Sequence, residues 1–280
     1  MQRALSTHLF VNYKLTVELL GKIEEASIPA IEIFCAKQHF DYTNSSQVAE
    51  LAAWFSDHHL QLRSLHGPLY NDYEWGRSGS STAVNLAEPE RGRRLDSVDE
   101  VKRALEVAER IAFRYLVVHL GVPDESFAQE KFDAAYASLE PLRIFARERG
   151  VEILLENIPN QLSTPQRLRE FIDYTGLSDL RICFDTGHAH LGKGVEADFE
   201  PLRELVVSTH VHDNAGQRDD HLFPFQGSIG WETALRALTT ANQDLPLQLE
   251  LRDLGEFPQP LEKAVETFRR LEELALAPPR

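Results

Sequence analysis

The residues of this chain that could do chemistry recur at the ends of short apolar segments. Histidines and carboxylates close or follow such segments in LRSLHGPL, LVVHLG, ILLENIP, CFDTGHAH, STHVHDN and LQLELRD. The positions are His66, His119, Glu156, Asp185, His188, His212 and Glu250. Imidazole and carboxylate groups are common protein ligands of divalent cations. Repeated apolar strands with polar endings are how a parallel barrel collects ligands at its carboxyl-end mouth.

Four of these residues form an oxygen-rich set that suits one divalent cation. They are Glu156, Asp185, His212 and Glu250. Three carboxylates and one imidazole suit Mn, Mg or Co, and they also accept Zn or Fe. A single carboxylate behind a strand usually caps the next helix or forms a surface ion pair, so the prediction depends on the repetition. We predict a divalent metal site at these four residues.

Further potential ligands surround this set and leave the number of ions open. The additional candidates are His66, His119, His188, Asp219 and His221. Nine ligands exceed the needs of one ion. Either two or three ions bind, or the extra groups contact a substrate. His8, His190 and His210 are interpreted as residues that support the site or pack beside it.

Strands and helices that alternate along the chain must position these groups. Apolar runs typical of buried parallel strands lie at 4–10, 30–34, 61–65, 115–119, 151–155, 180–184, 206–211 and 246–250. Amphipathic segments with helical spacing lie between or behind them, for instance at 98–111, 128–149 and 259–275. Ser126 and Thr164 precede such segments as candidate helix N-caps. Eight strand–helix units predict an α/β fold, a single (β/α)8 TIM barrel.

The long connections of this barrel are expected to carry function. No linker rich in Gly, Ser or Pro divides the sequence, so we predict one domain over residues 1–280. The segments 66–95 and 212–230 are long for a compact fold, and each follows a candidate ligand. Their aromatic residues predict either an apolar wall over the substrate or ordinary loop packing; they are Tyr70, Tyr73, Trp75, Phe223, Phe225 and Trp231.

The composition limits the partners of the chain. Lys and Arg number 29 against 44 Asp and Glu, a net charge of −15 that disfavours a sequence-independent grip on nucleic acid. Cys35 and Cys183 lie in apolar runs and are predicted to be buried thiols. No apolar run reaches the roughly 20 residues of a membrane helix, and no secretory signal is evident. We expect a cytoplasmic protein without membrane contact.

The segments quoted above, with NLAEPERGRR and THVHDNAGQRDDHL, resemble the xylose isomerase-like barrel superfamily of sugar isomerases, ketose 3-epimerases and type IV AP endonucleases. The resemblance to the epimerases implies one metal at the four-residue set, with substrate contacts from His188 and Arg218. His66 and His119 would then also contact substrate. The resemblance to the endonucleases implies three zinc ions held by all nine candidates.

Two functions from different reaction classes follow. The first is a metal-dependent isomerase or epimerase of a sugar or related hydroxy-carbonyl compound, acting through a metal-stabilised enediolate, with Glu156 and Glu250 moving the proton. The alternative is a zinc-dependent AP endonuclease-type phosphodiesterase; an inositol-type dehydratase or lyase is a third, weaker reading. The endonuclease would need a basic rim, for which Arg77, Arg91, Arg93 and Arg94 are candidates. The resemblance also implies a possible homo-oligomer.

Overall fold

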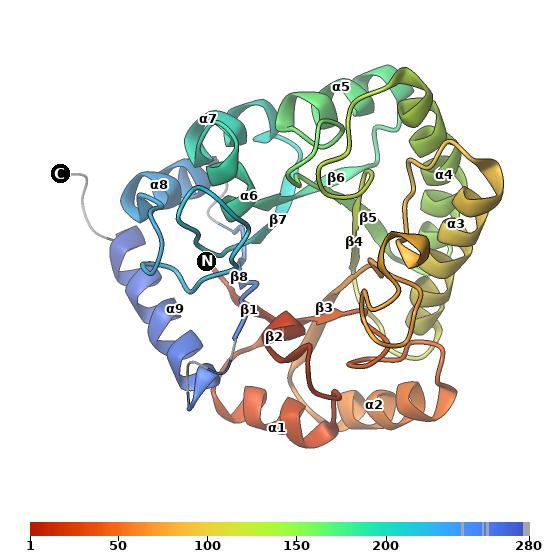
Figure 1. The fold of residues 1–280 in the computed structure, drawn as a ribbon. Helices are drawn as coiled ribbons and strands as arrows, with labels where there is room; N and C mark the ends of the chain where they lie inside the picture. Colours follow the sequence, from red (N-terminus) through yellow and green to blue (C-terminus); the bar gives the residue numbers. More distant parts are fainter. Residues whose placement is uncertain (242–243, 254, 256–257, 277–280) are drawn as a thin grey trace.

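Eight short apolar segments form one parallel sheet that curves into a barrel (Figure 1). The computed structural model describes residues 1–241, 244–253, 255 and 258–276. The strands are β1 Arg3–Ser6, β2 Ala30–Phe34, β3 Gln61–His66, β4 Tyr115–His119, β5 Glu152–Glu156, β6 Arg181–Asp185, β7 Val206–His210 and β8 Leu247–Leu249. Neighbours in the sequence are neighbours in the sheet, and β1 pairs with β8. A parallel bridge between Val211 and Leu249 joins β7 to β8.

Helices surround the barrel, as Figure 1 shows from one end. They are α1 Val17–Glu25, α2 Ser45–Asp57, α3 Arg91–Leu105, α4 Gln129–Arg147, α5 Pro165–Thr175, α6 Thr186–Leu191, α7 Val195–Phe199, α8 Trp231–Ala241 and α9 Pro260–Leu276. Short 3-10 turns lie at Thr7–Phe10, Gly79–Thr82, Glu106–Glu109 and Glu200–Leu202. Among the described residues, no helix is both long enough and apolar enough to cross a bilayer. The predicted (β/α)8 TIM barrel is confirmed.

The local predictions differ from the structure at several element ends; the predicted helix 98–111, for instance, is α3 from Arg91 to Leu105. The first predicted strand, 4–10, is too long, because the chain turns into a 3-10 helix at Thr7. Ser126 is not the N-cap of α4; that position is Ala128, which makes no side-chain cap. The Thr164 cap is confirmed, since its side chain accepts from the Arg167 N–H with Pro165 at the first helical turn. Positions 242–243, 254, 256–257 and 277–280 of the predicted domain lie outside the described residues.

The main apolar core lies between the strands and the surrounding helices, whereas the barrel interior carries a polar layer. Cys35 and Cys183 are buried free thiols, as predicted. Fully buried polar side chains of the strands include Glu32, Ser64, His210 and Gln248. Buried polar groups persist only where partners satisfy them or where they serve a site. The interior therefore leads directly to the polar residues at the carboxyl-end mouth.

Candidate metal centre and cavity

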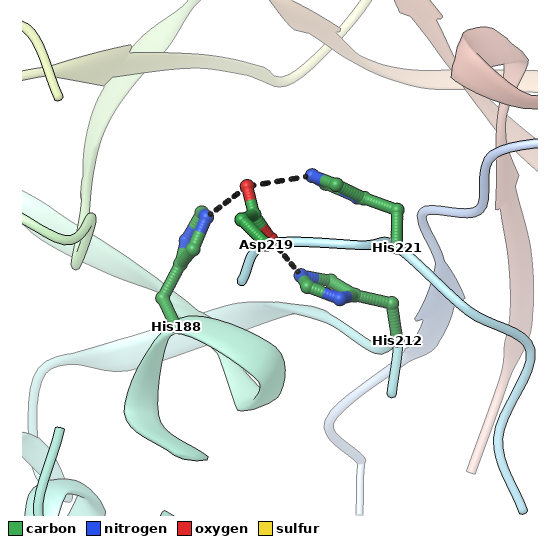
Figure 2. Close-up of side chains that lie close together, drawn as sticks. All are labelled: His188, His212, Asp219 and His221. Carbon is green, nitrogen blue, oxygen red and sulfur yellow. Dashed lines mark hydrogen bonds and ion pairs between the residues drawn. The ribbon is translucent and has the colours of Figure 1, made fainter. Parts of the chain in front are cut away.

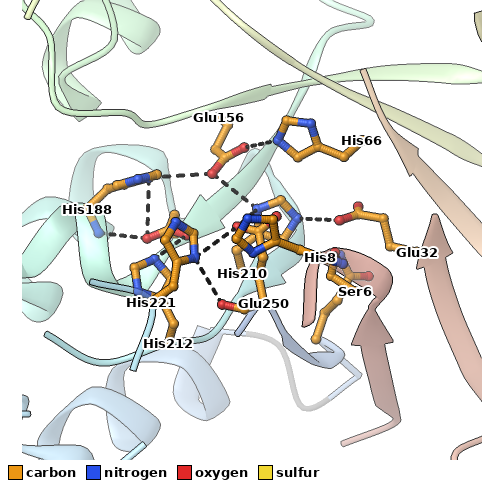
Figure 3. Close-up of polar contacts among 12 residues, drawn as sticks. Ser6, His8, Glu32, His66, Glu156, His188, His210, His212, His221 and Glu250 are labelled. Carbon is orange, nitrogen blue, oxygen red and sulfur yellow. Dashed lines mark hydrogen bonds and ion pairs between the residues drawn. The ribbon is translucent and has the colours of Figure 1, made fainter. Parts of the chain in front are cut away.

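Three of the four residues predicted to bind one metal, Glu156, Asp185 and Glu250, come together at the carboxyl-end mouth of the barrel (Figure 3). The imidazole that joins them there, with ligand atoms all within 4.8 Å of one another, is His210, whereas the predicted His212 belongs to a neighbouring group. Further groups that satisfy the same criterion adjoin this one. One combines His66 and His119 with Glu156, and another consists of His188, His212, Asp219 and His221.

Strand order explains why the first adjoining group forms. His66 and His119 end β3 and β4, and Glu156 ends β5, so three neighbouring strands present their last side chains at one edge. His119 Nε2 lies 3.1 Å from Glu156 Oε2, and His66 Nε2 lies 3.4 Å from the same oxygen. His66 Nδ1 donates a hydrogen bond to the Gly67 carbonyl at 2.9 Å. The other ring nitrogen, Nε2, therefore faces the carboxylate.

The second adjoining group is built around Asp219, in the long connection 212–230 (Figure 2). Its Oδ2 lies 3.1 Å from both His188 Nε2 and His221 Nε2. Its Oδ1 lies 3.7 Å from His212 Nε2. His221 is fixed from behind, since its Nδ1 lies 3.0 Å from the Glu250 carbonyl. The loop that follows β7 therefore brings the Asp219 carboxylate and the His221 imidazole to the carboxyl-end mouth of the barrel.

Asp185 has both of the roles that the sequence left open. Its Oδ1 accepts from the His188 N–H at 2.6 Å and caps α6, as an isolated carboxylate behind a strand usually does. Its Oδ2 lies 3.0 Å from His212 Nε2. The Asn157 side chain exchanges two hydrogen bonds with the Asp185 backbone, which fixes the strand end. The cap thus orients the second oxygen toward the centre.

The structure places His210 among the candidate metal ligands, which the sequence analysis did not predict. We interpreted it as a supporting or packing residue, yet its Nδ1 lies 3.1 Å from Glu156 Oε1 and 3.5 Å from Glu250 Oε2. The signal was available in the motif His-Val-His. Side chains two residues apart on a strand point to the same face. If either His210 or His212 points into the barrel, the other therefore does so as well.

Several buried polar atoms of the centre lack a hydrogen-bond partner within the described part of the chain. They are Glu156 Oε1, Asp185 Oδ2, His188 Nδ1, His210 Nδ1, His212 Nε2, Asp219 Oδ1 and Glu250 Oε1. A buried polar atom without a hydrogen-bond partner lowers the stability of the folded state. Carboxylate oxygens and imidazole nitrogens that face one another at short range are the expected surroundings of a cation. The residues therefore fit a divalent metal.

The two glutamates of the centre differ in their electrostatics. Burial alone would raise the pKa of Glu156, but the facing His210 and His119 outweigh it and hold that pKa well below its ordinary value. Burial raises the pKa of Glu250, helped by the Glu156 charge and only partly offset by His210. Burial lowers the pKa of His188, yet Asp185 and Asp219 outweigh it and raise that pKa well above its ordinary value. Without a cation, the surroundings therefore favour the ionised form of Glu156 more strongly than that of Glu250.

A cavity of about 460 Å³ opens onto the centre. Its inner lining includes His66, His119, Glu156, His188, Asp219, His221 and Glu250. Phe34, Leu69 and Trp75 form an apolar wall on one side, and Trp75 is thus the loop aromatic that fulfils the predicted wall. Phe225 instead packs beneath Arg270, 3.9 Å from its guanidinium carbon. Arg218, the predicted substrate contact, lies exposed at the cavity mouth and 3.7 Å from Asp220.

The connection after β7 is held in shape by a buried carboxylate outside the centre. Asp213 Oδ1 accepts from the Ile229 N–H, and Oδ2 accepts from the Phe225 N–H and from Trp231 Nε1. These hydrogen bonds join both ends of the segment 212–230. Sequence reasoning did not single out Asp213, although its place directly behind His212 is a signal that could have found it. It fixes the loop that carries Asp219 and His221.

The sequence matches the family model described as xylose isomerase-like TIM barrel over residues 20–274. An uncharacterized protein of Sinorhizobium fredii is 29% identical over 56% of this chain, and the match spans 53%, about half, of that relative. "Probable endonuclease 4" of Natronomonas pharaonis is 29% identical over 61% of this chain and 68% of the relative. "Inosose isomerase" of Bacillus velezensis is 21% identical over 95% of this chain and 92% of the relative.

Solved structures share the whole architecture. The crystal structure of a D-tagatose 3-epimerase-like protein superposes with a TM-score of 0.77 at 23% identity, and 98% of each chain is covered. That similarity shows the fold. The family model covers most of the chain, and the chain therefore belongs to the family of xylose isomerase-like TIM barrels.

Proposed function

We propose that the chain is a metal-dependent isomerase or epimerase of a sugar or a related hydroxy-carbonyl compound. The observation that carries this proposal is the cavity of about 460 Å³ whose lining includes both Glu156 and Glu250, which lie close together. Its size suits a small molecule rather than a polymer. An inosose isomerase and a D-tagatose 3-epimerase-like protein among the similar proteins support the same substrate class.

The two glutamates supply the proton transfer. A divalent cation bound at the centre would act as a Lewis acid toward neighbouring carbonyl and hydroxyl oxygens of the substrate. Glu156 and Glu250 together line the cavity; one removes the proton from the carbon beside the carbonyl as general base, and the other returns a proton as general acid.

The cavity walls fit an uncharged substrate with one apolar face. Phe34 and Trp75 present aromatic rings on one side, their centroids 5.3 Å apart. Arg218 and Arg252 lie at the rim rather than at the inner end, where they can position terminal oxygens. The carbonyl-bearing end of the substrate then meets the carboxylates, and the hydroxyl-bearing end meets the rim. His66, His119 and His188 line the path between them and can hold hydroxyl oxygens.

One observation favours a second candidate, a zinc-dependent phosphodiesterase. All nine residues expected of a trinuclear centre gather at the mouth, and four of the similar proteins carry the name "Probable endonuclease 4". Two of the four residues proposed as a DNA-facing rim are engaged within the chain, whereas Arg91 and Arg93 are exposed. Arg77 pairs with Glu74, and Arg94 donates to the backbone carbonyls of Glu88 and Pro89 at the start of α3.

Deuterium exchange tests the first function directly. The metal-loaded protein, incubated in D2O with a panel of ketoses and inososes, is expected to incorporate deuterium beside the carbonyl, as NMR detects. Glu156→Gln and Glu250→Gln should each slow incorporation by at least about 100-fold. Glu152→Gln, at the exposed start of the same strand β5, is the matched control and should exchange normally.

The outcomes separate the candidate functions. Full exchange in both variants would remove the proton-transfer roles. Cleavage of a duplex with one abasic site, together with three zinc ions per chain, would establish the phosphodiesterase instead. A product lighter than its substrate by one water would indicate the dehydratase reading.

A further inference from the structure

A pair of buried residues beneath the metal centre links two opposite parts of the barrel. His210 ends β7 and Glu32 lies in β2, and both side chains are fully buried. His210 Nε2 lies 3.0 Å from Glu32 Oε1, as the dashed line in Figure 3 marks. Ser64 Oγ donates to Glu32 Oε2 at 2.8 Å. Each oxygen of Glu32 thus has one hydrogen-bond partner, and Glu32 is fixed in the barrel interior.

This arrangement decides which nitrogen of His210 carries the proton. A carboxylate accepts hydrogen bonds and cannot donate them, so Nε2 donates its hydrogen to Glu32. In the neutral ring the lone pair then lies on Nδ1. Nδ1 faces Glu156 and Glu250, which are also acceptors; without a cation a proton on Nδ1 can serve these carboxylates, and a bound cation would replace that proton. An imidazole backed by a carboxylate in this way is the usual form of a metal-binding histidine.

The contacts of Nδ1 have a spacing that fits two ligands of one metal ion, although the shorter contact is also within hydrogen-bond range. Nδ1 lies 3.1 Å from Glu156 Oε1 and 3.5 Å from Glu250 Oε2, and yet it has no hydrogen-bond partner within the described part of the chain. Two ligand atoms that each lie about 2.1 Å from one ion, at octahedral to tetrahedral angles, are about 3.0 to 3.4 Å apart. Asp185 offers an oxygen within the same 4.8 Å group.

We propose that His210 binds the cation of the centre through Nδ1, beside Glu156 and Glu250, and that Glu32 orients it from behind. The inference rests on the cation of the proposed function but not on the reaction that the cation serves. It places the imidazole of His210 beside the predicted ligands Glu156, Asp185 and Glu250, whereas His212 lies in the neighbouring group with His188, Asp219 and His221. Nitrogen ligands favour Zn, Co and Mn over Mg, so the extra imidazole selects a transition metal.

Metal binding to chelator-treated protein tests the proposal. Zn²⁺ and Co²⁺ affinities are measured by competition with a chromophoric chelator, beside the visible spectrum of the Co²⁺ form. His210→Asn should weaken binding by at least about 30-fold and shift the Co²⁺ bands. Glu32→Gln should weaken binding by about tenfold, because its amide oxygen still accepts the Nε2 hydrogen but lacks the charge. Glu32→Gln also keeps the test valid if His210→Asn fails to fold.

His190→Asn is the matched control, because His190 belongs to the comparable motif His-Ala-His but its Nε2 contacts Ser228 Oγ at 2.8 Å. Its affinity should stay within twofold of the unaltered chain. If the unaltered chain binds the metal and both His210→Asn and Glu32→Gln bind it equally well with unchanged Co²⁺ bands, this inference is wrong while the proposed function stands. If the unaltered chain binds no divalent cation, both are wrong.

Discussion

Two fully buried histidines, His39 and His212, have opposite surroundings. His39, behind β2, donates from Nδ1 to the Tyr13 carbonyl, and its Nε2 lies 2.9 Å from Thr7 Oγ1. His212, at the mouth, directs Nε2 at Asp185 and Asp219 but has no hydrogen-bond partner there within the described residues. His39 and His212 are equally buried, but they differ in whether their ring nitrogens have hydrogen-bond partners. A buried histidine whose ring nitrogens both have hydrogen-bond partners serves packing, whereas a buried histidine with a ring nitrogen that lacks a partner is available to bind a ligand.

The buried carboxylates divide in the same way. Asp213 accepts hydrogen bonds on both oxygens and serves the shape of the loop. Glu156, Asp185 and Glu250 each keep one oxygen unmet. The difference separates the residues that hold the barrel together from those that await a cation, and it does so within a few residues of the same strand ends.

Substituting one histidine of each kind tests whether unpaired and hydrogen-bonded ring nitrogens have different roles. His212→Asn should weaken Zn²⁺ or Co²⁺ binding by at least about 100-fold, because a ligand is lost, and should change the metal-free stability by less than about 1 kcal/mol. His39→Asn should lower the free energy of unfolding by about 2 kcal/mol and leave metal affinity within twofold. Chelator competition and urea unfolding measure the two quantities. Lost metal binding in His39→Asn would undo the distinction.

The buried position of His39 also predicts how the free energy of unfolding depends on pH. Burial lowers the pKa of His39 from 6.5 to about 4, since the carbonyl bonds only partly offset desolvation. Between those values the unfolded chain binds a proton that the folded chain excludes. The contribution of neutral His39 is therefore complete above pH 6.5 and is lost as the pH falls toward 4. From pH 7 to pH 5 the loss is about 2 kcal/mol.

Urea unfolding at both pH values, with a chelator present, isolates this contribution. His39→Asn should lose about 2 kcal/mol less between pH 7 and pH 5 than the unaltered chain, because every other titrating group is shared. Equal losses in the two proteins would show that His39 does not titrate as its buried position requires.

The sequence predicted the barrel and most donors of the centre, because both depend on local patterns. Apolar runs that end in His119, Glu156 or Asp185 are visible without any knowledge of distant contacts. Thr164 followed by Pro165 was equally local. The first strand was predicted too long because the run 4–10 stays apolar while the backbone turns. Ser126 has the chemistry of a cap, but α4 begins three residues later.

The motif His-Val-His places His210 on the same side as His212, but the partner of His210 could not be predicted in the same way. That partner is Glu32, which lies 178 positions earlier in the chain and across the barrel. A single acid in the segment AIEIF gives no sign that a histidine of β7 faces it. The same holds for Asp213, whose partners lie 12 to 18 residues further along the loop. Pairings across the fold are set by closure of the barrel, not by local spacing.

The smallest expected effect concerns the position of an imidazole rather than its presence. An added Cβ at Gly187 would lie 2.0 Å from His212 Cε1 and 2.3 Å from Nδ1, so the ring must move in Gly187→Ala. Metal affinity should fall by about tenfold although every ligand remains. Gly21→Ala is the control: its Cβ would meet nothing within 4 Å in α1, and it should raise stability by about 0.5 kcal/mol without changing affinity. If Gly187→Ala binds metal as tightly as the unaltered chain, then the ring of His212 need not occupy its observed place, and the unmet nitrogen there is no mark of a ligand.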